Sequence, residues 1–211
     1  MVKWQIHLDL QCPHSKRVFD QLDDLKAAFG DEYEISVVLT ALPFHHNAFY
    51  AMQGAYAVES LAGAAARDMF IKEAFAQQGT FENSPTAAMP RSKVLELFAG
   101  IAEQSCKVRK ADAVVRMQDW SIATFPAWQE VQIGILSGVT GTPKHVIGSE
   151  MVDDAESEWG VGEWQARLAK IKARSRAKWL VAAAVAVAVG VWRVPSSARD
   201  RRSSARDRSA W

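Results

Sequence analysis

Cysteine is scarce in this sequence, since its 211 residues include only Cys12 and Cys106. A small secreted protein that is held together by disulfides usually has more cysteines in a shorter chain. The N-terminus also lacks the long apolar stretch and the small-residue cleavage site of a signal peptide. The sequence therefore predicts a protein of a reducing compartment, and we expect a cytoplasmic location.

A strong excess of charge is also missing, because the formal net charge is +1. Residues 193–211 contain six arginines and two aspartates, so this tail carries +4 and the rest of the chain about −3. A body without excess positive charge gives no electrostatic reason to expect nucleic-acid binding. We expect the tail to be disordered, since its sequence is polar and of low complexity.

Long apolar runs are absent as well. The main candidate, residues 179–192, has 14 residues, mostly Ala and Val. A helix that crosses a bilayer needs about 20 apolar residues. We therefore predict a short apolar segment there, and a membrane tail anchor with tryptophans at the interface is the alternative.

The sequence does contain a clear succession of strand and helix patterns. Residues 2–10 alternate apolar and polar side chains, which is typical of a strand. Residues 16–29 place apolar side chains on one face of a helix, and residues 33–39 are rich in β-branched residues, as in a covered strand. These segments predict a right-handed βαβ unit.

Helix-favouring sequence replaces the strand patterns from about residue 47 to residue 137. Asn47 is a suitable cap for a first long helix, and Asn83-Ser84-Pro85 is a turn signal between helices. Another helix is predicted from Ser92 to about Cys106. This region is therefore interpreted as a helical insertion in an α/β domain.

Strand character returns after the insertion. Residues 144–147 and 151–152 are short strand patterns joined by a turn. An amphipathic helix is predicted over residues 162–178. The fold class is then α/β, in the order β-α-β, helical insertion, β-β-α, with a domain over residues 1–178 and a helical or disordered C-terminal extension.

The stretch Cys12-Pro13-His14-Ser15 lies between the first strand and the first helix. At a helix N-terminus, unpaired N–H groups and the positive end of the helix dipole favour the thiolate, which is the reactive form of cysteine. Pro13 suits the first helical position because its missing N–H needs no partner there. The sequence therefore predicts Cys12 as a nucleophile. His14 either stabilises the thiolate further or is a solvent-facing turn residue.

This motif, together with Thr142-Pro143 before the third strand and the insertion between them, resembles the DsbA-like branch of the thioredoxin superfamily. The resemblance covers roughly residues 2–175. It implies a thioredoxin-like fold with a cis proline at Pro143, whose loop lies against the sulfur of Cys12. It also implies that Pro13, Thr142 and Pro143 form the substrate platform, where the backbone of Thr142 pairs with an extended substrate.

The sequence departs from the family at two positions. Ser15 replaces the second cysteine of the C-x-x-C motif, and His145 stands where members of the family usually carry an apolar aromatic residue. Ser15 can hydrogen-bond a thiolate at Cys12 but cannot break a mixed disulfide, so an external thiol such as glutathione has to do so unless Cys106 approaches. The resemblance thus predicts a monothiol disulfide oxidoreductase that acts on a protein or glutathione thiol or disulfide, with no bound cofactor.

Two other functions stay open. The first is a kappa-type glutathione transferase or a chromene-carboxylate isomerase, in which the thiolate of bound glutathione does the chemistry. The second is a catalytically silent binding module, because a fold does not imply a function. Of the other candidate residues, His45-His46 lacks further ligands for a metal and Cys106 is expected to be buried. Core and edge packing is expected for four tryptophans, Trp120, Trp128, Trp159 and Trp164.

Overall fold

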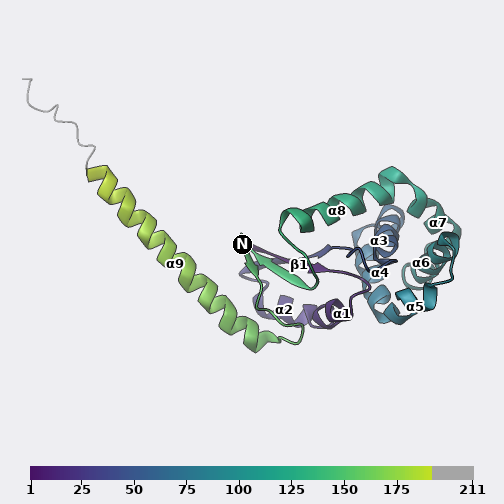
Figure 1. The fold of residues 1–211 in the computed structure, drawn as a ribbon, viewed down its shortest axis with the longest axis horizontal. Coiled ribbons are helices and arrows are strands. Elements are labelled where there is room, and N and C mark those ends of the chain that lie inside the picture. Colours follow the sequence, from purple (N-terminus) through teal and green to yellow (C-terminus); the bar gives the residue numbers. More distant parts are fainter. Residues whose placement is uncertain (192–211) are drawn as a thin grey trace, which may run out of the picture. The chain divides into compact units, whose positions relative to one another are not determined.

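The computed structural model describes residues 1–191 of the chain. The chain divides into two compact units, Met1–Val161 and Gly162–Trp211. The first unit contains the sheet, the helices that cover it and the helical insertion, and it carries every predicted site residue (Figure 1). The α/β architecture that the sequence predicts is confirmed.

The sheet has four strands in the order β2-β1-β3-β4. β1 (Val2–Leu8) is parallel to β2 (Tyr33–Leu39) and antiparallel to β3 (Lys144–Ile147). β3 in turn is antiparallel to β4 (Glu150–Val152). β1 ends two residues before the predicted Leu10. Because β1 is an inner strand with helices on both faces, its central side chains are buried on both sides.

One face of the sheet is covered by two helices, α1 (Pro13–Asp20) and α2 (Leu22–Phe29). The prediction of one helix over residues 16–29 is therefore wrong, because the helical segment is divided at Gln21. On this face, the rings of Trp4 and Phe29 lie 5.9 Å apart between centroids.

The other face is covered by α8 (Phe125–Leu136), as Figure 1 shows. Gly134 allows a close approach there, since a Cβ atom at this position would lie 2.9 Å from Cγ2 of Thr40. Two residues from the polar side of the predicted strand pattern, His7 and Asp9, are thereby buried in the domain.

The insertion is entirely helical, as predicted. Its main helices are α3 (Ala48–Ala62), α4 (Ala64–Ala76), α5 (Asn83–Thr86), α6 (Arg91–Cys106) and α7 (Lys110–Gln118). Two shorter elements, η1 (Gln78–Thr80) and the π-helical turn η2 (Trp120–Thr124), complete it.

Aromatic side chains form the core of the insertion, where the rings of Phe81 and Phe98 lie 4.9 Å apart. The prediction that Trp120 and Trp128 pack in the core or at its edge is wrong, because these side chains are 64% and 46% exposed. Both lie close to Phe125, which spans the space between them. Aromatic residues are apolar enough for a core, but their position on η2 and α8 turns them outward.

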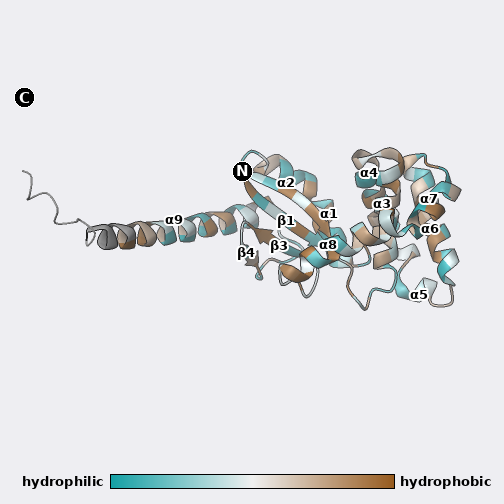
Figure 2. Cartoon of the chain, turned by 90° about the horizontal axis from the view of Figure 1, so that it is seen from above, coloured by the Kyte–Doolittle hydropathy of each residue, from teal (hydrophilic) through white to brown (hydrophobic). Residues whose placement is uncertain are grey.

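The second unit consists of α9 (Val161–Val191) as far as the structure describes it. The predicted helix over residues 162–178 and the apolar segment that follows it are therefore one continuous helix up to Val191. Figure 2 shows mixed hydropathy along its first part and more apolar colouring toward its far end. Within residues 1–191, no helix combines the length and the apolar character that crossing a membrane requires. The basic tail at residues 193–211 lies outside the described residues.

Candidate active site

The predicted motif lies where the chain leaves the central strand and enters α1. Cys12 is the N-cap residue of α1, with an extended backbone (φ −80°, ψ 119°), and Pro13 occupies the first helical turn. The carbonyl of Cys12 accepts a hydrogen bond of 3.1 Å from the N–H of Lys16, which starts the helix. The placement of Cys12 and Pro13 thus follows the ordinary rules of helix initiation.

The sulfur of Cys12 meets the loop that carries Pro143. Its Sγ donates a hydrogen bond of 3.3 Å to the carbonyl of Thr142, 130 residues further along the chain. The Thr142–Pro143 peptide bond is cis. Cys12 is 5% exposed and makes no side-chain capping bond to α1. Its sulfur is therefore held between α1 and the proline loop, and its hydrogen-bond partner is a carbonyl rather than an N–H group.

Thr142 presents a second polar atom in this loop. Its Oγ1 is buried and has no hydrogen-bond partner within the described residues. A buried hydroxyl without a partner costs free energy, so such groups are uncommon in folded proteins. Thr142 is thus placed beside Cys12 with an unused hydroxyl as well as a backbone that contacts the sulfur.

Ser15 is fully buried and belongs to the turn rather than to the sulfur. Its Oγ accepts a hydrogen bond of 3.1 Å from the N–H of Asp9. No hydrogen bond joins Ser15 to Cys12 in residues 1–191, so the expected contact between the serine hydroxyl and the sulfur is absent. Ser15 instead connects α1 to the end of β1 and fixes the turn between them.

His14 is exposed and is engaged on its Nδ1 side. Its Nδ1 lies 3.2 Å from Oγ of Ser157 and also accepts a hydrogen bond from the guanidinium of Arg17. Because arginine only donates, Nδ1 is an acceptor and the ring proton is on Nε2. Arg17 also pairs with Glu158 at 3.1 Å. Among the described hydrogen bonds, none joins His14 to Cys12, and the ring is tied to the loop that follows β4.

A buried carboxylate, Asp9, organises the loop before Cys12, and the sequence analysis did not identify it. Asp9 is 1% exposed. Its carboxylate accepts hydrogen bonds of 2.7 Å from the N–H groups of Gln11 and Leu42, and Nδ1 of His45 lies 3.0 Å from Oδ2. Burial raises the pKa of Asp9, and these contacts partly oppose that rise. An acidic residue between Leu8 and Leu10 was the available signal.

Two glutamines connect the same loop to the insertion. The side-chain amide of Gln78 donates to the carbonyls of Leu10 and Cys12, at 2.8 and 3.1 Å. Gln11 donates to the carbonyl of Phe81 at 2.7 Å and accepts from the N–H of Asn47 at 2.6 Å. The backbone on both sides of Cys12 is therefore held by side chains that lie far away in the sequence.

Two buried histidines lie behind the site, in β1 and β3. Burial lowers the pKa of His7 to about 4 and that of His145 to about 3. Both rings are therefore neutral at neutral pH. Nδ1 of His145 accepts a hydrogen bond of 3.0 Å from the indole N–H of Trp4. This bond explains why a polar ring is tolerated at the position where the family usually has an apolar aromatic residue.

The remaining candidates lie apart from the motif. Cys106 is only partly buried, which corrects the expectation of a buried thiol, and its Sγ donates to the carbonyl of Ala66 at 3.2 Å. In the described part of the chain, no group of three or more His, Cys, Asp or Glu side chains could hold a metal ion.

Comparison with known proteins supports the fold through structure alone. No protein-family model matches the sequence, and no curated protein matches it significantly. A candidate protein-disulfide isomerase from Pseudomonas syringae is similar with a TM-score of 0.68 at 18% identity, over 79% of this chain and 92% of that one. The oxidoreductase DsbA1 from Neisseria meningitidis has a TM-score of 0.57 at 16% identity, over 83% and 86% of the two chains.

BdbD from Bacillus subtilis is similar in the same way, with a TM-score of 0.55 at 14% identity, over 72% of this chain and 79% of that one. The chain has the DsbA-like thioredoxin fold. In this fold the β1–α1 turn and the loop before β3 meet, which places Cys12 beside Thr142.

Proposed function

We propose that the protein catalyses thiol–disulfide exchange through Cys12 alone and that an external thiol such as glutathione completes the reaction. The observation that supports this best is the contact of 3.3 Å between Sγ of Cys12 and the carbonyl of Thr142, next to the cis proline. The similar structures include proteins named as an oxidoreductase and as a candidate protein-disulfide isomerase. A sulfur at a helix N-terminus beside an exposed backbone suits an extended substrate that carries a disulfide.

The proposed reaction begins when Cys12 loses its proton to solvent and attacks one sulfur of the substrate disulfide. The substrate S–S bond breaks, a mixed disulfide forms at Cys12, and the other substrate sulfur leaves as a thiolate that takes up a proton. A glutathione thiolate then attacks the substrate sulfur of the mixed disulfide and releases Cys12. A second glutathione frees the substrate thiol, so that two glutathione molecules are oxidised to one disulfide while the substrate is reduced.

Ser15 gives this reaction its dependence on an external thiol. It occupies the position from which a second cysteine would attack the mixed disulfide, and its oxygen is already bonded to the N–H of Asp9. Asp9, Gln11 and Gln78 would keep the turn fixed while the sulfur changes partner. The platform would be formed by Pro13, Thr142 and Pro143.

The test is the formation of a mixed disulfide with oxidised glutathione, followed by intact-mass spectrometry on the Cys106→Ala variant. We expect one glutathione per chain, attached to Cys12, which persists after the oxidised glutathione is removed and is released by reduced glutathione. The matched control is Cys12→Ala with Cys106 in place, which should take up none. An adduct on Cys106 alone, or no adduct on either cysteine, would contradict the proposal.

The same measurement separates the proposal from the transferase or isomerase alternative. In that alternative, the glutathione sulfur reacts and Cys12 is dispensable. Calorimetric titration of the Cys12→Ser variant with reduced glutathione should therefore show little binding if our proposal holds. Tight binding by this variant, together with conjugating activity, would favour the alternative.

A further inference from the structure

β2 forms an outer edge of the sheet. Within residues 1–191, β1 is the only strand that pairs with it. An edge strand presents N–H and C=O groups that can pair with another extended chain. We therefore asked which backbone groups of β2 face outward.

Two hydrogen bonds at the end of β2 determine this direction. The N–H of Thr40 donates to the carbonyl of Leu8 in β1, at 2.8 Å, and so points inward. The N–H of Leu39 donates to Oε1 of Glu130, at 2.9 Å, and so points outward. Because backbone direction alternates along a strand, the N–H and C=O groups of Ile35 and Val37 also point outward. No hydrogen bond to these groups is found among the described residues.

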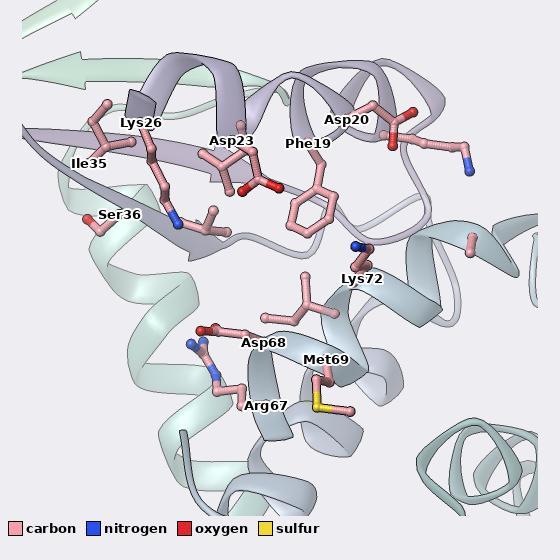
Figure 3. Close-up of a pocket in the computed structure, with 15 residues that line it drawn as sticks. Phe19, Asp20, Asp23, Lys26, Ile35, Ser36, Arg67, Asp68, Met69 and Lys72 are labelled. Carbon is pink, nitrogen blue, oxygen red and sulfur yellow. The ribbon is translucent and has the colours of Figure 1, made fainter. Parts of the chain in front are cut away.

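The outward edge lies in a groove of about 690 Å³. Figure 3 shows Ile35 and Ser36 on the strand, with side chains of α1 and α2 above and of α4 below. The labelled wall residues include Phe19, Asp23, Lys26, Asp68, Met69 and Lys72. The volume is within the range of about 300–1,000 Å³ that bound ligands occupy. Since helices border it on both sides, the groove suits one extended segment better than the edge of a second sheet.

The charges of the groove favour a basic segment. Arg67 is neutralised by Glu130, and Nζ of Lys16 already donates to the carbonyl of Phe75, at 2.8 Å. The lining side chains without an ion partner among the described residues are then Asp20, Asp23, Asp68, Lys26 and Lys72. Three carboxylates against two ammonium groups leave the groove with an excess of negative charge.

We propose that the outer edge of β2 binds an extended segment of a partner protein, which adds to the sheet as a fifth strand. The backbone of this segment would pair with Ile35 and Val37, and a basic side chain would meet the unpaired carboxylates. Cys12 and Thr142 do not line the groove, so this site goes beyond the proposed thiol chemistry.

The test uses the full-length, 15N-labelled protein and the blocked peptide acetyl-Val-Lys-Val-Thr-Val-amide. Amide hydrogen exchange by NMR should show that peptide binding slows exchange at Ile35 and Val37 and leaves Ser36 and Val38, which face β1, unchanged. The same peptide with N-methylated amides at alternate residues should not bind. Absence of saturable binding by the unmodified peptide at millimolar concentration would overturn the proposal.

The matched protein variants are Val37→Pro and Val37→Ala. Proline removes only an outward N–H and is tolerated on edge strands, so the fold should persist and the peptide affinity should fall at least about threefold. Alanine retains the N–H and should bind within about twofold of the original affinity. Equal binding by the proline variant and by the N-methylated peptide would overturn the proposal.

Two further outcomes separate this site from others. Protection of Ile35 and Val37 that grows with protein concentration, without peptide, would indicate a contact between copies of this chain and would overturn the assignment of a partner protein. The Cys12→Ala variant should bind the peptide unchanged, whatever the result of the glutathione experiment. A loss of binding in that variant would contradict a separate site.

Discussion

The two cysteines lie at opposite ends of helices, yet each donates a hydrogen bond to a backbone carbonyl. Cys12 is the N-cap residue of α1 and contacts Thr142, whereas Cys106 is the last residue of α6 and contacts Ala66. The helix dipole favours negative charge at the first position and disfavours it at the second. Hydrogen bonding to a carbonyl therefore does not distinguish the two thiols, whereas their helix positions do.

The two surroundings also differ in how they are built. The backbone around Cys12 is held by side chains from β1 and the insertion, such as Asp9 and Gln78, and its sulfur meets a loop before β3. Cys106 has local neighbours, with Oγ of Ser105 at 3.2 Å from its sulfur. A thiol that many distant segments enclose is a better candidate for a built site than one at a helix end.

The largest expected effect comes from giving Cys12 a partner thiol through Ser15→Cys. The glutathione adduct should then be lost without added thiol, at least about tenfold faster than at millimolar glutathione, because well-placed intramolecular groups act at very high effective concentration. Time-resolved mass spectrometry of the isolated adduct measures this. The matched change beside the other cysteine, Ser105→Cys, should leave the Cys12 adduct stable, and equal rates in both variants would contradict the comparison.

The second effect is on stability in acid. Burial lowers the pKa of His7 to about 4 and of His145 to about 3, whereas the unfolded chain protonates both near 6.5. The free energy of unfolding is therefore maintained above pH 6.5 and falls toward pH 4, by up to about 1.36 kcal/mol per pH unit for each histidine. Asp9 opposes this where it titrates, because its raised pKa lets the folded state bind a proton first.

Urea unfolding at a series of pH values measures this loss, and His145→Phe should reduce its slope. Hydrogen exchange should show that β1 and β3 open before α6 as the pH falls. A free energy of unfolding that stays constant between pH 6.5 and 4.5 would contradict the prediction.

A smaller effect is expected when Gln78 loses its amide. The change Gln78→Leu removes the donors to the carbonyls of Leu10 and Cys12, which should lower the free energy of unfolding by about 1–3 kcal/mol. It should also slow glutathione uptake at Cys12, since the turn is less fixed. The control Ser105→Ala should have an effect close to zero, because the helix propensity of alanine offsets the lost bond. Equal losses in the two variants would contradict the contrast.

The smallest effect is expected for Cys106→Ala. This change should lower the free energy of unfolding by about 1 kcal/mol or less, because the side chain is only partly buried. Exchange at Cys12 should stay within about twofold of the original rate, measured with a small disulfide substrate and glutathione. A large loss of exchange would mean that Cys106 takes part in the reaction.

Much of the local structure could be predicted from the sequence. The bounds of β2 and β3, the all-helical insertion and the position of Cys12 before a helix follow from hydrophobic period and helix-start signals, which depend on neighbouring residues. The division of the first helix at Gln21 could not, since apolar spacing continues through it. The outward position of Trp120 was missed for a related reason, because composition does not indicate which face of an element is covered.

The sequence by itself determined the order of the elements and placed a reactive type of residue at a helix start. Only the tertiary structure decided which groups meet there. Ser15 bonds to Asp9 and not to Cys12, His145 serves Trp4, and Gln78 holds the backbone of the motif. Such pairs join segments that packing brings together. Cys12 meets Thr142 because the central position of β1 brings its end against the loop before β3.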